Sequence, residues 1–272
     1  MHKEINIMTI YPCAKINLGL NVVRKRPDGY HDLETVFYPV PLCDVLQITP
    51  SDEKTSLTLK GAPLEGDPEQ NLVIKAYRAV RECHPIPEVN ITLEKRIPSQ
   101  AGMGGGSSDC AFTIRALNDL FNIGMSIDEM RGIAAKLGAD CPFFIDPRPS
   151  FAQGIGERLE QIPVSLEGYW IAILKPNISV STREAFSRIV PKRPSERCDI
   201  IVKGNIKEWK DRLLNDFEES VFAIYPELSV IKQRFYDMGA VYSCMSGSGS
   251  AMVALFENEP PIIDGEYYKL KL

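Results

Sequence analysis

The sequence predicts an α+β fold in two halves, and three observations support that prediction. The first sixty residues alternate apolar and polar side chains as strands do, whereas later segments carry apolar residues at helical spacing. Each half contains a loop rich in glycine, at residues 102–106 and 245–250. The chain of 272 residues is 44% hydrophobic, which is enough apolar material for one large core or two smaller ones.

Strands dominate the expected N-terminal half. In residues 14–23 apolar side chains alternate with polar ones or glycine, so that Lys15 and Asn17 share the face opposite the apolar side chains. A helix is expected to open at residues 107–109, directly after the glycine-rich loop at 102–106. Other strand-like segments lie at 35–40, 44–49, 55–60 and 89–94, and residues 71–83 have helical spacing.

A further helix is predicted by its end signals. Ser126 and Glu129 form the pattern of a capping box at its start, and Gly138 ends it. Residues 142–145 are strand-like. Asp140 therefore lies in the short connection that follows this helix.

The stretch 146–156 is rich in glycine and proline and marks the expected boundary between the two halves. The predicted domains are therefore residues 1–152 and residues 153–272. In the second domain we expect a buried strand at 169–175, helices near 182–190, 205–215 and 226–238, and two strands around the loop at 245–250.

Charge and cysteine content exclude several classes of protein. The chain has a formal net charge of −5, which disfavours general nucleic-acid binding because that function needs a basic surface. The seven cysteines are scattered without a CxxC pair, as expected in a reducing cytoplasm rather than in a disulfide framework or zinc site. The first ten residues lack the apolar core of a signal peptide, and the longest apolar run is too short to span a bilayer. We therefore expect a soluble, cytoplasmic protein that contacts neither nucleic acid nor membrane.

The segment Pro98–Ser108 is the strongest functional signal. Its four glycines permit positive φ angles and close approach of the backbone to a ligand. Consecutive N–H groups and the N-terminus of the following helix suit an anion, most naturally phosphate. A flexible linker is the alternative, but a linker would not need the amphipathic helix that begins at once. The loop lacks both the lysine of a Walker P-loop and the spacing of a dinucleotide fingerprint, so the cation that neutralises phosphate must come from elsewhere.

The chain resembles the GHMP kinase superfamily over nearly its whole length. Three motifs carry the resemblance in family order: Pro12–Leu18 (PCAKINL), Pro98–Ser108 (PSQAGMGGGSS) and Met245–Ala251 (MSGSGSA). Three more resemble the members that phosphorylate a cytidine diphosphate-linked methylerythritol in non-mevalonate isoprenoid biosynthesis: Arg26–His31 (RPDGYH), Leu137–Pro142 (LGADCP) and Phe151–Glu157 (FAQGIGE). The resemblance implies a two-domain fold, with a first domain like domain 2 of ribosomal protein S5 and a ferredoxin-like second domain.

The resemblance also implies transfer of the γ-phosphate of ATP, with Mg²⁺, to the 2-hydroxyl of the substrate. Lys15 and Asp140 match the catalytic positions: Asp140 would accept the hydroxyl proton, and Lys15 would keep Asp140 ionised and offset charge on the transferring group. Without the resemblance, Asp140 would be taken for a solvated loop carboxylate and Lys15 for a strand lysine that faces water. The ATP-binding positions implied are Asn71, Lys95, Pro98, Ser99, Gln100, Ala101, Gly102, Met103, Gly104, Gly105, Gly106, Ser107 and Ser108.

The cytidine end of the substrate has its own implied residues. His31 matches a histidine that pairs with the cytosine edge, and the rings of Tyr30 and Phe186 match positions that stack on the base. From the residues alone, His31 could equally be a turn histidine bonded to its own backbone. The complete set of substrate-binding positions implied is Asn17, Tyr30, His31, Phe37, Thr182 and Phe186.

Several alternatives stay open at this point. Ser107 either reaches Mg²⁺ or the β-phosphate, or it is a plain helix N-cap. Asp109 stands where asparagine is common in the family, which would add a carboxylate near the phosphates. The protein could be another GHMP kinase, of the homoserine or mevalonate type, or a non-catalytic nucleotide-binding regulator. The cytidine-binding pattern argues against the first, and the presence of both Lys15 and Asp140 argues against the second. We expect a monomer or a homodimer.

Overall fold

A computed structural model describes residues 7–62, 67–261 and 267–272, which form two compact units. Unit 1 contains the described residues up to Ala14 together with Leu42–Ser99 and Gly104–Pro147. Unit 2 contains Lys15–Pro41, Gln100–Met103 and Arg148–Leu272.

The change of unit after Pro147 falls within the expected boundary stretch, but residues 15–41 and 100–103 join the C-terminal part of the chain. A single boundary in the sequence cannot describe this division, because strand pairing brings together segments that are far apart in the chain. Residues 1–6, which belong to the segment examined for a signal peptide, lie outside the described residues.

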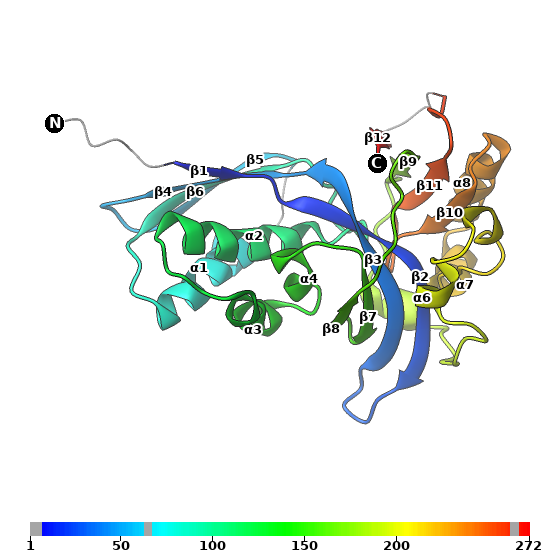
Figure 1. Ribbon diagram of the computed structural model, residues 1–272, viewed down its shortest axis with the longest axis horizontal. Helices are drawn as coiled ribbons and strands as arrows, with labels where there is room; N and C mark the ends of the chain where they lie inside the picture. The colour runs from blue at the N-terminus through cyan, green and yellow to red at the C-terminus, as the bar shows by residue number, and fades with distance from the viewer. Residues whose placement is uncertain (1–6, 63–66, 262–266) are drawn as a thin grey trace. The chain divides into compact units, whose positions relative to one another are not determined.

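Unit 1 is a four-stranded sheet with its helices gathered along one face (Figure 1). The strand order is β1-β4-β6-β5, and only β5 and β6 pair in parallel. Its elements are β1 (Met8–Ile10), β4 (Val45–Pro50), β5 (Ser56–Gly61), η1 (Pro68–Gln70), α1 (Leu72–Cys83), β6 (Val89–Lys95), α2 (Gly105–Leu120), α3 (Ile127–Leu137) and α4 (Cys141–Ile145).

Unit 2 contains two four-stranded sheets, with strand orders β2-β3-β7-β8 and β10-β11-β9-β12. The long hairpin of β2 (Cys13–Lys25) and β3 (His31–Cys43) begins and ends with residues of unit 1. Helix α8 packs on β10 and β11 of the second sheet (Figure 1). The other elements are β7 (Ser150–Gly154), β8 (Arg158–Gln161), β9 (Trp170–Leu174), α5 (Thr182–Phe186), α6 (Cys198–Ile201), η2 (Ile206–Glu208), α7 (Phe217–Ile224), α8 (Glu227–Asp237), β10 (Tyr242–Met245), β11 (Met252–Phe256) and β12 (Tyr267–Lys271).

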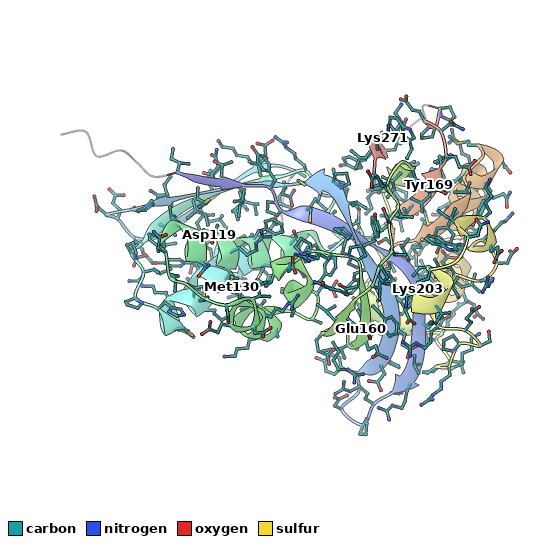
Figure 2. The ribbon with its side chains drawn as sticks, viewed as in Figure 1. Asp119, Met130, Glu160, Tyr169, Lys203 and Lys271 are labelled. Atoms are coloured by element: carbon teal, nitrogen blue, oxygen red, sulfur yellow. The ribbon has the colours of Figure 1, made fainter. Side chains whose placement is uncertain are left out.

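Each unit has its own apolar core. In unit 1, β4 and β6 bury alternate side chains, α2 packs against β4 and α1, and Val73, Ala76 and Val80 of the α1 stripe that the helical spacing predicts are fully buried. In unit 2, β2 contributes Leu20 and Val22 to a cluster with residues of α7, α8 and β11. Charged side chains such as Asp119, Glu160 and Lys203 are exposed, whereas Met130 of α3 is buried (Figure 2).

The predicted strands and the best-capped helix are confirmed. Each strand-like segment named for the first sixty residues corresponds to a strand, although β4 and β5 begin one residue later than expected and β3 is longer than expected. Helix α3 has the predicted capping box: the Glu129 carboxylate accepts the Ser126 N–H at 2.7 Å, the Ser126 hydroxyl accepts the Glu129 N–H, and Gly138 is the C-cap.

Other predictions of local structure are wrong. Residues 142–145, expected as a strand, form most of the short helix α4, where Pro142 takes a first-turn position that suits its fixed φ. The helix expected at 205–215 is reduced to the single turn η2, and the one expected at 182–190 ends at Phe186. Helices α6 and α7 were not predicted. Among the described residues, no helix is both long and apolar enough to cross a membrane.

Candidate active site

The glycine-rich loop passes from unit 2 to unit 1 between Met103 and Gly104. Two of its four glycines, Gly102 and Gly104, have positive φ angles of 70°. Gly102 also makes a close backbone contact, since a Cβ atom there would lie 1.9 Å from the carbonyl oxygen of Ser246. The first glycine loop therefore packs against the second glycine loop inside unit 2, which only a residue without a side chain allows.

Helix α2 begins two residues earlier than the sequence predicts, at Gly105. Its N-cap is Gly104, without a side-chain hydrogen bond, so the reading of Ser107 as the N-cap is wrong. The first intrahelical hydrogen bond runs from the Ser108 N–H to the Gly104 carbonyl at 2.8 Å. The N–H groups of Gly105, Gly106 and Ser107 precede that bond, and N–H groups at this position suit a phosphate.

The hydroxyl groups of the two serines have different surroundings. Ser108 is fully buried, and its hydroxyl donates to the Cys13 carbonyl at 2.7 Å. Ser107 lies beside the turn before α4, since a Cβ atom at Gly138 would be 3.9 Å from the Ser107 Oγ. Of the two, Ser107 therefore remains the candidate for contact with a ligand.

Asp140 occupies the N-cap position of α4, in that same turn of unit 1, and its side chain makes no capping bond. It is partly exposed to solvent. Ser107 and Asp140 thus place a hydroxyl and a carboxylate at neighbouring points of unit 1. Lys15 belongs to unit 2, and its pairing with Asp140 remains a prediction.

Lys15 is almost completely buried, with 3% of its surface exposed. Its ammonium group donates to Asn17 Oδ1 at 2.6 Å and to the Gly102 carbonyl at 3.0 Å, and it lies 4.8 Å from the ring centre of Phe37. Its main-chain N–H donates to the Met103 carbonyl at 3.0 Å. Lys15 is therefore tied to the glycine loop by both its backbone and its side chain.

Asn17 is held in turn by residues that the sequence analysis did not name. Its amide nitrogen donates to the Thr35 hydroxyl at 2.9 Å, and that hydroxyl donates to the Gly19 carbonyl at 2.5 Å. The Ser246 hydroxyl shares the Gly102 carbonyl with Lys15, at 3.0 Å. The available signal was the position of Thr35 on a strand next to β2, but the register that makes the two side chains meet is not visible in the sequence.

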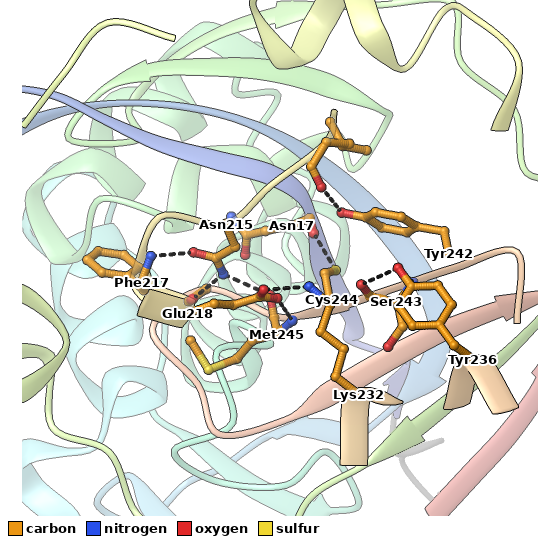
Figure 3. A network of polar contacts seen from close by, with 12 residues as sticks. Asn17, Asn215, Phe217, Glu218, Lys232, Tyr236, Tyr242, Ser243, Cys244 and Met245 are labelled. Atoms are coloured by element: carbon orange, nitrogen blue, oxygen red, sulfur yellow. Dashed lines mark hydrogen bonds and ion pairs between the residues drawn. The ribbon is translucent and has the colours of Figure 1, made fainter. Parts of the chain in front are cut away.

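The second glycine loop is anchored by a buried polar network in unit 2 (Figure 3). Asn215 donates to the carbonyl groups of Met245 and Gly247, both at 2.8 Å. The Glu218 carboxylate accepts a hydrogen bond from the Met245 N–H at 2.8 Å and forms an ion pair with Lys232 at 2.6 Å. Burial raises the pKa of Glu218, and the nearby ammonium of Lys232 opposes that rise. This network fixes the loop against which Gly102 packs.

The expected contact of Lys95 with ATP remains a prediction, and the structure shows other partners for its side chain. Its side chain is buried and forms ion pairs with Asp44 and with Asp109, the latter at 2.6 Å. A Cβ atom at Gly105 would lie 3.4 Å from its Nζ, so this cluster sits directly under the first turn of α2. The carboxylate of Asp109, expected to lie near the phosphates, is instead turned into this buried cluster.

Asn71 is the N-cap of α1, where its side chain accepts the Val73 N–H at 2.9 Å. That bond uses the amide oxygen in helix capping. Any contact of this side chain with a nucleotide would therefore come from its remaining amide N–H groups.

The residues matched to cytidine binding form an aromatic group in unit 2. The rings of His31 and Phe186 are stacked with centres 4.5 Å apart, and Phe217 meets Phe186 edge-on at 4.7 Å. Tyr30 is 62% exposed in the turn beside them. Burial, and to a lesser degree the charge of Lys25, lowers the pKa of His31, so the imidazole is neutral at pH 7. Thr182 is the first residue of α5, after a capping box formed by Ser181 and Glu184.

Comparison with known proteins identifies the family. Residues 71–146 match the GHMP kinases N terminal domain, and residues 199–264 match the GHMP kinases C terminal domain. The 4-diphosphocytidyl-2-C-methyl-D-erythritol kinase of Bacteroides thetaiotaomicron is 52% identical over 256 residues, which cover 93% of each chain. The chain belongs to the 4-diphosphocytidyl-2-C-methyl-D-erythritol kinase family. A relative of the same name from Bacteroides fragilis is 48% identical over 94% of each chain.

Solved structures agree with membership of this kinase family. The crystal structure of a 4-(cytidine 5'-diphospho)-2C-methyl-D-erythritol kinase is 33% identical, with a TM-score of 0.79, and the match covers 91% of this chain and 90% of that one. A homoserine kinase from Cytophaga hutchinsonii is 18% identical with a TM-score of 0.64, and covers 94% of this chain and 86% of its own. At that identity the likeness shows only a common fold. The two-domain GHMP kinase fold expected from the sequence is confirmed.

Proposed function

We propose that this protein uses ATP to phosphorylate the 2-hydroxyl of 4-diphosphocytidyl-2-C-methyl-D-erythritol, a step of non-mevalonate isoprenoid precursor synthesis. The proposal rests on the relatives of that name at 48% and 52% identity over nearly the whole chain. The observation in the structure that supports it most is the buried ammonium of Lys15, held at the glycine loop by Asn17 and Gly102. We place the protein in the cytoplasm, as a monomer or homodimer acting on small molecules.

In this proposal the phosphates of ATP bind at the start of α2. The N–H groups of Gly105, Gly106 and Ser107 would donate hydrogen bonds to the phosphate oxygens, and the positive end of the helix dipole would add to the attraction. Lys15 would offset the charge that develops on the transferring phosphoryl group. Because its ammonium is already held by two oxygen acceptors, little reorganisation is needed during the reaction.

Asp140 is the proposed general base. It would accept the proton of the 2-hydroxyl as that oxygen attacks the γ-phosphorus, and the bond between the γ-phosphorus and the β,γ-bridging oxygen breaks to release ADP. Its place at the start of α4 leaves the carboxylate without a capping bond of its own.

Mg²⁺ is expected with ATP. Among the described residues, no group of three or more histidine, cysteine or acidic side chains is arranged to hold a metal ion. Such a cluster is not required, because Mg²⁺ in kinases is commonly held by one or two protein oxygens, water and the phosphates. The Ser107 hydroxyl, in unit 1, fits that donor set as one protein oxygen. The ion would neutralise phosphate charge when bound.

The aromatic group is the proposed site of the cytosine. Neutral His31 offers one donor and one acceptor nitrogen, which match the acceptor and donor groups on a cytosine edge. The Phe186 ring is now stacked on His31, so a base that stacks on that face must first displace the His31 ring. Tyr30 would then cover the base from the exposed side. Asn17, Phe37 and Thr182 are the remaining proposed substrate contacts.

An ATP-coupled assay tests the substrate. The cytidine-linked diol, homoserine and mevalonate are each supplied with ATP and Mg²⁺, and ADP release is followed. We expect turnover of the cytidine-linked diol alone. Preferential turnover of either competitor would refute the proposed substrate while leaving the family assignment unchanged. Absence of turnover with all three would favour the alternative of a non-catalytic nucleotide-binding regulator.

Asp140→Asn is the matched test of the proposed base. We expect kcat to fall by about 10²–10⁴, the usual contribution of general base catalysis, with an unchanged circular dichroism spectrum. Asp146→Asn, which removes a carboxylate at the other end of α4, is the control. Near-normal kcat in Asp140→Asn would remove this residue from the mechanism.

A further inference from the structure

Unit 2 contains a cavity that the proposed kinase reaction does not use. It has a volume of about 790 Å³ and lies between the turn end of the β2–β3 hairpin, strands β7 and β8, and the chain before α6. That volume is within the range of small-molecule sites. Its lining residues are Val23, Arg24, Asp32, Leu33, Glu34, Gln153, Gly154, Arg158, Arg193, Pro194, Ser195, Glu196, Arg197 and Ile200.

The acidic residues of β3 in the cavity lining lie on the face of that strand opposite the proposed active-site residues, although Leu33 of the other face also borders the cavity. Thr35 points toward Asn17, to which it is hydrogen-bonded, and Leu33 packs against the apolar cluster that Phe186 also contacts. Side chains alternate along a strand, so Asp32 and Glu34 point the other way, into the cavity. A ligand in the cavity would therefore not compete for the Lys15 and Asn17 positions.

Arginine is the commonest lining residue, although the chain as a whole is acidic. Arg24 is paired with Asp32, and Arg197 forms a two-bonded pair with Asp199 at 2.8 and 3.0 Å. Within the described part of the chain, the side chains of Arg158 and Arg193 form no ion pair or hydrogen bond. They reach the cavity from different walls, β8 and the chain before α6. Two such guanidinium groups can hold a phosphate by paired hydrogen bonds.

Glu34 adds a second requirement on the ligand. Its Oε2 atom is buried and makes no hydrogen bond, while its Oε1 accepts from Gln153 at 3.4 Å. An unpaired buried carboxylate oxygen is costly, and a rotation of the Glu34 side chain toward the cavity would let a hydroxyl or amino group of a ligand satisfy it. The other two carboxylates of the lining are already paired, Asp32 with Arg24 and Glu196 with Arg212.

The cavity is also bordered by the motif Phe151–Glu157, which has no proposed catalytic role. Gln153 and Gly154 of the segment Phe151–Glu157 line the cavity. The Arg197 guanidinium lies over the ring of Phe151, at 4.6 Å from its centre. The Glu157 carboxylate folds back to accept the Ile155 N–H at 2.7 Å, which shapes the tight turn between β7 and β8 and so positions Arg158.

We propose that this cavity is a second ligand site, which binds a small phosphate ester that carries free hydroxyl groups. Arg158 and Arg193 bind the phosphate, and the Oε2 atom of Glu34 accepts a hydrogen bond from a hydroxyl of the same molecule. The proposal does not depend on the proposed substrate of the kinase reaction, because Arg158, Arg193 and Glu34 are not among the proposed active-site residues.

Isothermal titration calorimetry with glycerol 3-phosphate tests this site. The full chain is titrated at low ionic strength with its kinase site occupied by CDP and a non-hydrolysable ATP analogue. We expect one site per chain with a Kd of about 1 mM or tighter. Absence of binding at tenfold that concentration, or binding that is lost when CDP and the analogue are present, would overturn the proposal.

Variants separate the two parts of the site. R158Q/R193Q should weaken glycerol 3-phosphate binding about tenfold or more, since each lost charged hydrogen bond contributes about 1.5–3 kcal/mol. E34A should weaken glycerol 3-phosphate binding and leave the weaker binding of inorganic phosphate unchanged. R234Q/K203Q removes the same charge from exposed positions outside the cavity and should bind like the wild type.

Kinase turnover without glycerol 3-phosphate should stay near the wild-type rate in R158Q/R193Q. Equal weakening by R158Q/R193Q and R234Q/K203Q would show only general charge attraction and would refute the site. Equal loss of phosphate and glycerol 3-phosphate binding in E34A would refute the role of Glu34.

Discussion

Among the described residues two lysines are buried, one in each unit, and their surroundings differ. Lys95 lies in unit 1 between the carboxylates of Asp44 and Asp109. Lys15 lies in unit 2 and donates to an amide oxygen of Asn17 and the backbone carbonyl of Gly102. The comparison teaches that burial of a lysine does not by itself indicate its role, because that role depends on the groups that accept hydrogen bonds from the ammonium.

The partners of Lys95 join three segments of unit 1. Asp44 precedes β4 and also accepts the backbone N–H groups of Arg96 and Ile97 after β6, at 2.5 and 2.8 Å, while Asp109 belongs to α2. Lys95 therefore holds the sheet to the helix. Two hydrogen-bond acceptors of Lys15, Asn17 and Gly102, belong instead to the two motifs that the family resemblance connects with catalysis.

Lys15→Met is the variant expected to have the largest effect. We expect kcat to fall by about 10²–10³, as when a group that stabilises transition-state charge is removed, with a thermal midpoint close to that of the wild type. The measurement is steady-state kinetics together with thermal unfolding followed by circular dichroism. If kcat stays near normal, Lys15 does not have the proposed catalytic role, and the functional difference between Lys15 and Lys95 is refuted.

Lys95→Met should show the opposite pattern. Removing the ammonium leaves two buried carboxylates facing each other, and breaking a buried ion pair in this way costs about 3–5 kcal/mol of unfolding free energy. Urea unfolding measures the loss. Lys75→Met, on the less buried part of α1, is the control for a change of lysine to methionine in unit 1. A loss of kcat without a loss of stability would assign Lys95 to the active site after all.

Asn17→Ala tests whether the hydrogen bond between Asn17 and the Lys15 ammonium matters for catalysis. The variant removes one acceptor of the ammonium, so we expect kcat to fall by about tenfold or more, because a hydrogen bond to a charged group contributes about 1.5–3 kcal/mol. Asn21→Ala is the control on the same strand, where the side chain makes only a long contact of 3.4 Å with Asp216. Equal effects of the two variants would mean that Asn17 acts through the stability of β2.

Asp109→Asn should show its effect as a change of stability with pH. Burial, opposed by the ammonium of Lys95 and aided by the charge of Asp44, raises the pKa of Asp109 from 3.8 to about 7. Its Oδ1 atom also makes no hydrogen bond. Between these two pH values the folded chain keeps a proton that the unfolded chain releases, so this group's contribution to stability is lost as pH rises from about 4 to about 7.

Urea unfolding of the wild type and Asp109→Asn across that pH range measures this contribution. The difference in unfolding free energy between the two proteins should shift in favour of the variant as pH rises. A difference that is independent of pH would show that Asp109 is ionised throughout and that the ammonium of Lys95 outweighs burial.

Secondary structure was predictable where local chemistry decides it. The alternation along β4 and β6 and the capping box of α3 each depend on neighbours within a few residues. The short helices α4, α6 and α7 were mistaken or missed. Each has eight residues or fewer and is stabilised mainly by tertiary packing, so its own sequence gives a weak signal.

The candidate site was predictable as a set of motifs and not as an arrangement. The motif resemblance named Lys15, Asn17 and Phe37, which lie together in unit 2. It did not separate Lys95, a buried structural residue, from the ligand-binding positions, and it did not name Thr35 or Ser246. Those contacts depend on strand register and on the meeting of two loops more than a hundred residues apart.

By itself, the sequence determined the family, the two glycine loops and most strands, because these follow from residue types at short and regular spacing. The tertiary structure alone decided where each buried charge finds its partner. A lysine in a strand can face water, a carboxylate or a carbonyl, and the free energy that selects among them comes from residues distant in the chain. Lys15 and Lys95, each in a strand-like segment, therefore could not be told apart by local pattern.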